Sequence, residues 1–136
     1  MHRQPQPSPL LHRSMIADAA ITGLTGLALI AGAGMLSSLL GVPQSLMRNA
    51  GLILIPYAVM VFYWSSPVRL SRPRVWTVIG LNLAWVVASV LLLTAGWIEP
   101  TALGVAFVLF QAVVVAVFTE LQYAGLRSLS VNPGRS

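Results

Sequence analysis

The sequence predicts an all-α membrane protein in which four transmembrane helices form a bundle, with the N-terminus and the C-terminus both in the cytoplasm. Two observations lead to this fold class. Hydrophobic residues make up 57% of the 136 residues and charged residues only 8%, which is more apolar surface than a water-soluble domain of this length can bury. The hydrophobic residues also fall into four runs that approach the length a helix needs to cross a bilayer.

The two ends of the chain are predicted to be disordered cytoplasmic tails. In residues 1–15, Pro5, Pro7 and Pro9 stand among polar residues, and proline is unfavourable inside a helix. Residues 125–136 are polar again. The transmembrane domain is therefore expected to occupy residues 16–124.

The first predicted span covers residues 16–40, and as a helix it would be about 37 Å long, enough to cross the hydrocarbon layer with a tilt. Gly41 and Pro43 then predict a short turn. The second span covers residues 46–64 and has Pro56 at its centre, where the missing backbone donor predicts a kink.

The third span covers residues 75–96 and is flanked by Trp76 and Trp97. Tryptophan is typical of the two interfaces of a membrane. The fourth span covers residues 101–123 and follows Pro100, a residue that suits the first turn of a helix.

The distribution of arginine predicts the orientation, because cationic loops stay in the cytoplasm. Seven of the eight arginines lie in the two tails and in the link between the second and third spans, and only Arg48 lies on the other side. Both termini are therefore expected in the cytoplasm. The arginine-only, alanine- and valine-rich composition and the compact loops favour a bacterial inner membrane.

A cleavable signal peptide is an alternative interpretation of the N-terminal segment. Arg3 and Arg13 precede an apolar run, and residues 31–33 are small, as at a cleavage site. The run continues to Leu40 and contains Asp18 near its start, and both features favour a true span.

Small residues recur along one side of the first span, namely Ala19, Gly23, Gly26, Ala33 and Ser37. Such a stripe allows another helix to approach closely. We expect that helix to belong to the same chain, and a homodimer contact is the alternative. An adjacent face carries Asp18, Thr22 and Thr25.

Polar residues in the later spans define a candidate intramembrane polar site, formed by Asn82, Trp85, Ser89, Gln111 and Pro56. Trp85 and Gln111 lie at roughly 15 and 18 Å from the inner ends of their spans, so the indole is expected to donate a hydrogen bond to the amide. The site either joins helices by hydrogen bonds or binds a small solute, and the sequence leaves both interpretations open.

Charged residues define a second candidate set at the inner interface, formed by Asp18, Glu120, Arg69, Arg72, Arg74 and Arg127. Asp18 is expected in the first turn of the first helix, where the helix dipole stabilises a carboxylate. No carboxylate is then expected near the middle of the membrane, where a proton relay would need one. The three arginines of the central link are also candidates for binding anionic lipid.

Catalytic chemistry is not expected. The chain has no cysteine, and His2 and His12 both lie in the N-terminal tail, so we predict no cofactor, no metal site and no enzyme activity. Arginines at the ends of apolar runs do not predict nucleic-acid binding. The expected partners are the lipid bilayer and either a second copy or another membrane protein.

Two functions are compatible with this sequence. The first is a non-catalytic accessory, assembly or regulatory subunit that acts through helix–helix contacts. The alternative is an oligomeric channel or carrier for a small solute, which would use the candidate intramembrane polar site.

Overall fold

The computed structural model describes residues 9–131, and every regular element in this range is a helix. There are five of them: α1 (Pro9–Ala31), α2 (Ala33–Leu40), α3 (Gln44–Trp64), α4 (Arg72–Thr94) and α5 (Ala102–Val131). Helices α1, α3, α4 and α5 are long and apolar enough to cross a membrane. The predicted fold class, an all-α membrane protein with four spans, is confirmed.

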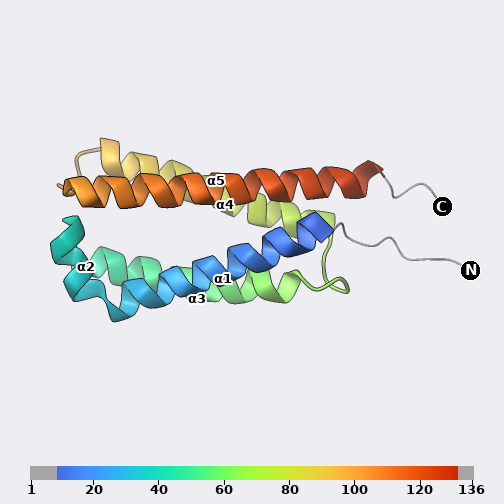
Figure 1. Ribbon diagram of the computed structural model, residues 1–136, viewed down its shortest axis with the longest axis horizontal. Coiled ribbons are helices and arrows are strands. Elements are labelled where there is room, and N and C mark those ends of the chain that lie inside the picture. Colours follow the sequence, from blue (N-terminus) through green and yellow to red (C-terminus); the bar gives the residue numbers. More distant parts are fainter. Residues whose placement is uncertain (1–8, 132–136) are drawn as a thin grey trace, which may run out of the picture.

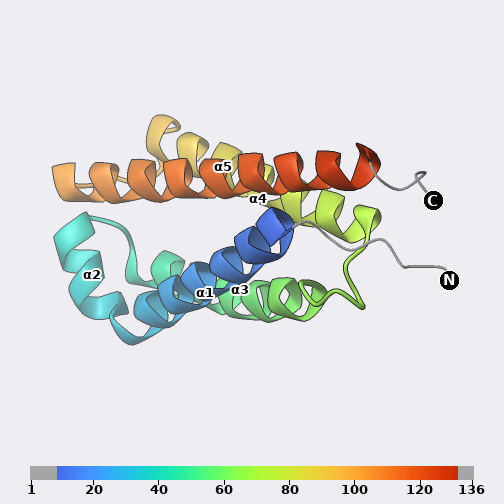
Figure 2. The ribbon, with the colours of Figure 1, turned by 45° about the vertical axis from the view of Figure 1, so that its right-hand side comes forward.

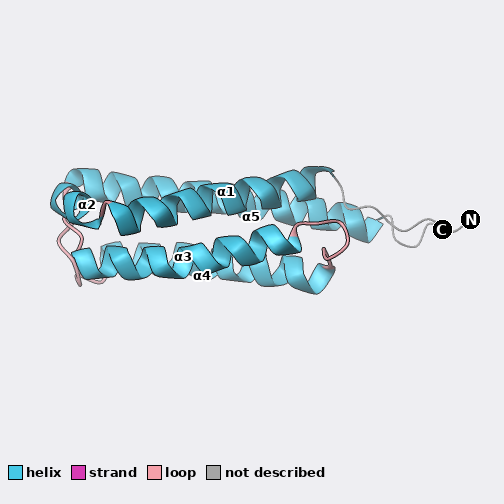
Figure 3. Cartoon of the chain, turned by 90° about the horizontal axis from the view of Figure 1, so that it is seen from below, coloured by secondary structure: helices cyan, strands magenta, loops and turns pink. Residues whose placement is uncertain are grey.

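The four long helices form two antiparallel pairs (Figures 1 and 3). Helix α1 packs along α3, and α4 packs along α5. The two pairs are joined mainly through α1 and α5. Short helix α2 lies across one end of the bundle and contacts both α3 and α5 (Figure 2). The start of α1, the α3–α4 link and the end of α5 lie together at the opposite end.

Helix α1 begins at Pro9, so the predicted N-terminal tail is wrong for residues 9–15. Proline is tolerated there because the first turn of a helix has no partner for its N–H groups. Leu11 and Met15, one turn apart, are completely buried in a core with Val61, Val75 and Leu126. This burial explains why the helix extends. Residues 1–8 lie outside the described residues.

Helix α5 continues past residue 124, so the predicted C-terminal tail is wrong for residues 125–131. Gly125 and Leu126 are buried, and a Cβ atom on Gly125 would lie only 2.6 Å from the Cβ atom of Leu11. The close approach of α1 and α5 keeps this part of the chain helical. Residues 132–136 lie outside the described residues.

The single span predicted for residues 16–40 is divided at Gly32 into α1 and α2. With 23 residues, α1 reaches about 34 Å and needs no further turns to cross a bilayer. Helix α2 instead directs its last carbonyls toward the start of α5. The carbonyl of Leu39 accepts from the Thr101 hydroxyl at 2.7 Å, and that of Leu40 accepts from the Thr101 N–H at 3.0 Å.

The second and third spans lie within three residues of the predicted bounds, and the fourth begins one residue after its predicted start. Helix α3 begins two residues before the expected start at 46, and α4 is displaced toward the N-terminus by two or three residues at each end. Helix α3 runs through Pro56 without interruption, and Pro56 is exposed on its outer side. The boundaries could be predicted because glycine, proline and polar residues stand on either side of each apolar segment.

Close packing of α1 on α3 depends on two facing glycines, Gly26 on α1 and Gly51 on α3. A Cβ atom on Gly51 would lie 2.7 Å from the carbonyl oxygen of Gly26 and 2.7 Å from the side chain of Ile30. A Cβ atom on Gly23 would make ordinary contact with Ala58 at 3.5 Å. The small-residue stripe of the first span is therefore used within the chain, as expected, through Gly23 and Gly26.

The close approach predicts that Gly51→Ala destabilises the protein. The added methyl group must displace the backbone of α1, at a cost of about 1–3 kcal/mol. The matched control is Gly80→Ala on α4, where no atom lies within 4 Å of the added carbon and alanine favours the helix by up to about 1 kcal/mol. Thermal unfolding in detergent micelles, followed by circular dichroism, measures both. Equal melting temperatures for the two variants would contradict the packing.

Candidate functional site

Asp18 lies inside the bundle. It is the tenth residue of α1, about 14 Å from the start of the helix, and only 2% of its surface is exposed. The prediction that it occupies the first turn, at the inner interface, is wrong because α1 begins at Pro9.

Three side chains donate hydrogen bonds to the Asp18 carboxylate. Its Oδ2 atom accepts from Asn82 Nδ2 at 3.1 Å and from Gln122 Nε2 at 2.8 Å. Its Oδ1 atom accepts from the Thr22 hydroxyl at 3.0 Å. Within the described part of the chain Asp18 forms no ion pair. The carboxylate is therefore held by neutral donors.

The network extends to α3. Asn82 Nδ2 also donates to Gln122 Oε1 at 3.2 Å, and the Tyr57 hydroxyl donates to Asn82 Oδ1 at 2.9 Å. We call these five residues the Asp18 cluster: Asp18, Thr22, Tyr57, Asn82 and Gln122. Every long helix contributes to it, so the cluster joins all four candidate spans.

Sequence reasoning missed Tyr57 and Gln122 as members of a site. A signal for Gln122 was present, because Gln122 lies five residues from Arg127 just as Asp18 lies five residues from Arg13. Equal distances from interfacial arginines place two residues at a similar depth. No comparable signal identifies Tyr57, because a tyrosine in a span is ordinarily expected near an interface.

A second network joins α4 to α5. The indole Nε1 of Trp85 donates to Gln111 Oε1 at 2.8 Å, which confirms the predicted bond. Gln111 Nε2 donates to the Ser89 hydroxyl at 2.9 Å and to the Val108 carbonyl at 2.9 Å. We call Trp85, Ser89 and Gln111 the Trp85 cluster. In the described residues, no buried side-chain nitrogen or oxygen lacks a hydrogen-bond partner.

The predicted intramembrane polar site is therefore divided. Trp85, Ser89 and Gln111 come together, but Asn82 belongs to the Asp18 cluster and Pro56 faces away from both. The division follows from helix geometry. Gln111 and Gln122 are 11 residues apart on α5, a rise of about 16 Å. Different residues of α4 therefore contact them: Trp85 bonds to Gln111, and Asn82 bonds to Gln122.

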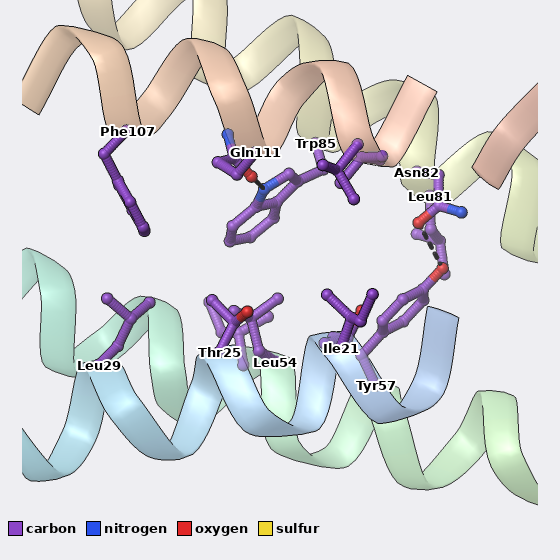
Figure 4. Close-up of a pocket in the computed structure, with 14 residues that line it drawn as sticks. Ile21, Thr25, Leu29, Leu54, Tyr57, Leu81, Asn82, Trp85, Phe107 and Gln111 are labelled. Carbon is purple, nitrogen blue, oxygen red and sulfur yellow. Dashed lines mark hydrogen bonds between the residues drawn. The ribbon is translucent and has the colours of Figure 1, made fainter. Parts of the chain in front are cut away.

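A cavity of about 180 Å³ lies between the two helix pairs. In Figure 4, Ile21, Thr25, Leu29 and Leu54 point into it from α1 and α3, while Leu81, Trp85, Phe107 and Gln111 line it from α4 and α5. Three members of the Asp18 cluster, Thr22, Tyr57 and Asn82, also line it. Asp18 itself does not, so the carboxylate lies behind these three side chains.

A second cavity of about 310 Å³ adjoins the first and extends toward α2, where Leu40 and Met47 line it. The two cavities share the lining residues Leu29, Ile53, Trp85, Phe107 and Gln111. We call them together the inter-pair cleft. Its lining is mostly hydrophobic, and its polar side chains are members of the two clusters together with Thr25, Asn49 and Trp97.

The inter-pair cleft opens on the apolar surface of the bundle. Ile53 on α3 and Leu81 on α4 both line it, and they are 60% and 45% exposed. Ile21 on α1 lines it as well and is 44% exposed. In a bilayer these positions meet lipid chains, so a molecule dissolved in the membrane can reach the cleft from the side.

The predicted interface charges other than Asp18 lie toward one end of the bundle. Arg69 lies 4.0 Å from the ring centre of Tyr63, and Arg74 donates to the Arg69 carbonyl at 2.7 Å. Arg127 stacks on Tyr123 at 5.9 Å. Arg72 and Glu120 are exposed. Among residues 9–131, no three His, Cys, Asp or Glu side chains gather closely enough to hold a metal ion.

The Asp18 cluster predicts that Asn82→Leu is strongly destabilising. The change removes one hydrogen bond each from Asp18 and Gln122 and leaves the Tyr57 hydroxyl only the Val78 carbonyl as acceptor. In an apolar interior this costs about 2–4 kcal/mol. The control, Asn49→Leu, makes the same chemical change at an exposed position of α3. Unfolding by denaturing detergent gives both free energies, and a loss no larger than that of the control would exclude a structural role for the cluster.

The Trp85 cluster predicts a smaller effect for Trp85→Phe. This change keeps an aromatic ring but removes the N–H donor, leaving Gln111 Oε1 without its partner, at a cost of about 1 kcal/mol. Trp97→Phe is the control, because Trp97 is 73% exposed in the α4–α5 link. Melting temperatures in the same detergent provide the comparison, and an unchanged value for the Trp85 variant would mean that the bond adds nothing to stability.

Comparisons with protein-family models, with curated proteins and with solved structures found no match to this chain. A functional assignment therefore depends on the geometry of the two clusters and the inter-pair cleft.

Proposed function

We propose that this chain is a non-catalytic membrane protein that binds a small, predominantly apolar molecule in the inter-pair cleft and acts as a carrier for it. This is the solute-binding function of the two that are compatible with the sequence. The observation that supports it is the cleft itself, which lies between two helix pairs and is lined by residues of all five helices.

The lining indicates the chemical class of the bound molecule. Ligand sites in proteins are commonly apolar, with a few polar groups that set orientation. Here the apolar wall includes Leu29, Ile53 and Phe107, and polar atoms are supplied by Gln111 at one wall and by Tyr57 at the end near Asp18. A lipophilic molecule that carries one or two polar atoms fits this arrangement better than an ion or a sugar.

The proposed location is a bacterial inner membrane, with the arginine-rich end of the bundle in the cytoplasm. Arg13, Arg69, Arg72, Arg74 and Arg127 belong to segments that meet at this end, whereas Arg48 follows the start of α3 at the other end. Cationic segments stay on the cytoplasmic side, so both termini are proposed to be cytoplasmic.

An accessory, assembly or regulatory subunit is the second candidate function, and the outer face of α4 favours it. The backbone of α4 packs mainly against α5, and the space around Gly80 is open. Ala84, one turn further along, is exposed. Small exposed residues at this spacing allow a helix of a second copy or of another membrane protein to approach closely.

Two alanines on α4 separate the candidates. Ala84 and Ala88 are both exposed and one turn apart, but only Ala88 lines the cleft. We expect Ala88→Leu to fill the cleft and to lower retention of the bound molecule about tenfold, which corresponds to 1.4 kcal/mol. Ala84→Leu should leave retention unchanged. The measurement is mass spectrometry of small molecules retained by the protein purified in native lipid particles.

The outcomes discriminate between the two functions. A molecule enriched over the bulk lipid in the wild type and in Ala84→Leu, and lost in Ala88→Leu, supports ligand binding. No enrichment in any sample contradicts it. Loss of a co-purifying protein in Ala84→Leu alone favours the accessory subunit.

A further inference from the structure

Within residues 9–131, the carboxyl group of Asp18 lies in the interior of the bundle without a cationic partner. Its carboxylate is 2% exposed and its three partners are neutral side chains. A buried carboxylate without a cation is costly even when it is hydrogen-bonded, and such residues within membrane spans ordinarily have a function. Binding one cation would remove the net charge.

The two carboxylate oxygens differ in what they can bind. Both partners of Oδ2 are amide N–H groups, which can only donate. The partner of Oδ1 is the Thr22 hydroxyl, which can donate or accept. Hard metal cations require oxygen ligands, whereas amide nitrogens face Oδ2. A proton on Oδ1 is the cation that this arrangement accommodates.

We propose that Asp18 is a reversible proton-binding site that is loaded through Thr22. A water in the cleft gives a proton to the Thr22 oxygen while the Thr22 hydrogen passes to Oδ1. The new O–H then donates to the Thr22 oxygen, and the remaining Thr22 hydrogen turns to the backbone carbonyl of Asp18, four residues earlier. Each partner keeps a hydrogen bond, and the carboxyl changes from negative to neutral. Deprotonation reverses the proton transfer and the rotation of the Thr22 hydroxyl.

The inter-pair cleft supplies the route for the proton. Thr22 both bonds to Asp18 and lines the 180 Å³ cavity, so its hydroxyl connects the carboxyl to any water in the cleft. Tyr57 and Asn82 line the same end of the cavity. A bound proton therefore changes the charge behind this end of the cleft, whether or not the proposed ligand is present.

In the part of the chain that the structure describes, the groups that face Asp18 include no cation. On α3 the titratable group facing the cluster is Tyr57, and on α4 and α5 the facing groups are the amides of Asn82 and Gln122. On α1, Arg13 is exposed and His12 is bonded to the Ser65 carbonyl at 2.9 Å.

The charged groups of α4 and α5 are exposed or make contacts elsewhere. Arg72, the first residue of α4, is exposed. Arg74 donates to the carbonyl of Arg69 in the α3–α4 link and stacks on Trp64. Glu120 is exposed, and Arg127 is exposed and stacks on Tyr123. None of these groups compensates the Asp18 charge.

The chain offers a direct test because Asp18 is its only aspartate. The full-length protein, labelled with ¹³C at the aspartate side-chain carboxyl and placed in lipid nanodiscs, is titrated from alkaline to acid pH while infrared difference spectra are recorded. We expect a protonated-acid carbonyl band that shows the ¹³C shift and grows on acidification. Unlabelled protein should show the band without the ¹³C shift. Labelled Asp18→Asn protein should lack the shifted band.

Variants of Thr22 test the loading step. Thr22→Ser keeps the hydroxyl and should keep the titration, whereas Thr22→Val should change the pH at which the labelled band grows. Glu120→Gln, which removes an exposed carboxyl on α5, is the control and should have no effect on that band.

Three results would overturn the proposal. The first is a labelled carboxylate band that does not change over the whole range in which circular dichroism shows folded protein. The second is a titration that is identical in Thr22→Val and the wild type, because Thr22 would then have no part in loading. The third is suppression of the protonated band by sodium but not by a large organic cation, which would identify a metal-cation site instead.

Discussion

The need of one buried carboxylate for hydrogen-bond donors determines how the four spans meet. A carboxylate in an apolar interior has no water to solvate it, so each lone pair without a donor raises the energy of the fold. Asp18 obtains its donors from α1, α4 and α5, and the amide of Asn82 in turn accepts from Tyr57 on α3. This requirement fixes the depth and the facing side of each helix.

The remaining contacts arrange the helices as two pairs rather than as a closed ring. Glycines bring α1 against α3, and the Trp85 cluster joins α4 to α5. At the end of the bundle near the termini, the pairs meet at the Asp18 cluster and at the contact between Leu11 and Gly125. At the other end they meet where Thr101 donates a hydrogen bond to the end of α2. Between these two junctions the side chains do not fill the space, and the inter-pair cleft results.

The polar groups and the cleft are therefore parts of one arrangement. The Asp18 cluster forms the end of the cleft near the termini, and the Trp85 cluster forms part of its wall. A molecule in the cleft would touch side chains that also hold the bundle together. Binding would then change the packing of all four spans. Such a change is a physical basis for either a carrier or a ligand-dependent subunit.

Hydropathy and residue spacing by themselves determined the class of this protein, its four apolar helices and the bond between Trp85 and Gln111. These are local quantities. They follow directly from the length of each apolar segment, the positions of proline and glycine, and the number of residues along a helix. The depth of Asp18, its bonds to residues 64 and 104 positions away, and the cleft were decided only by the tertiary structure. They depend on where α1 begins and on which faces of distant helices meet, and both are set by long-range packing that no local pattern encodes.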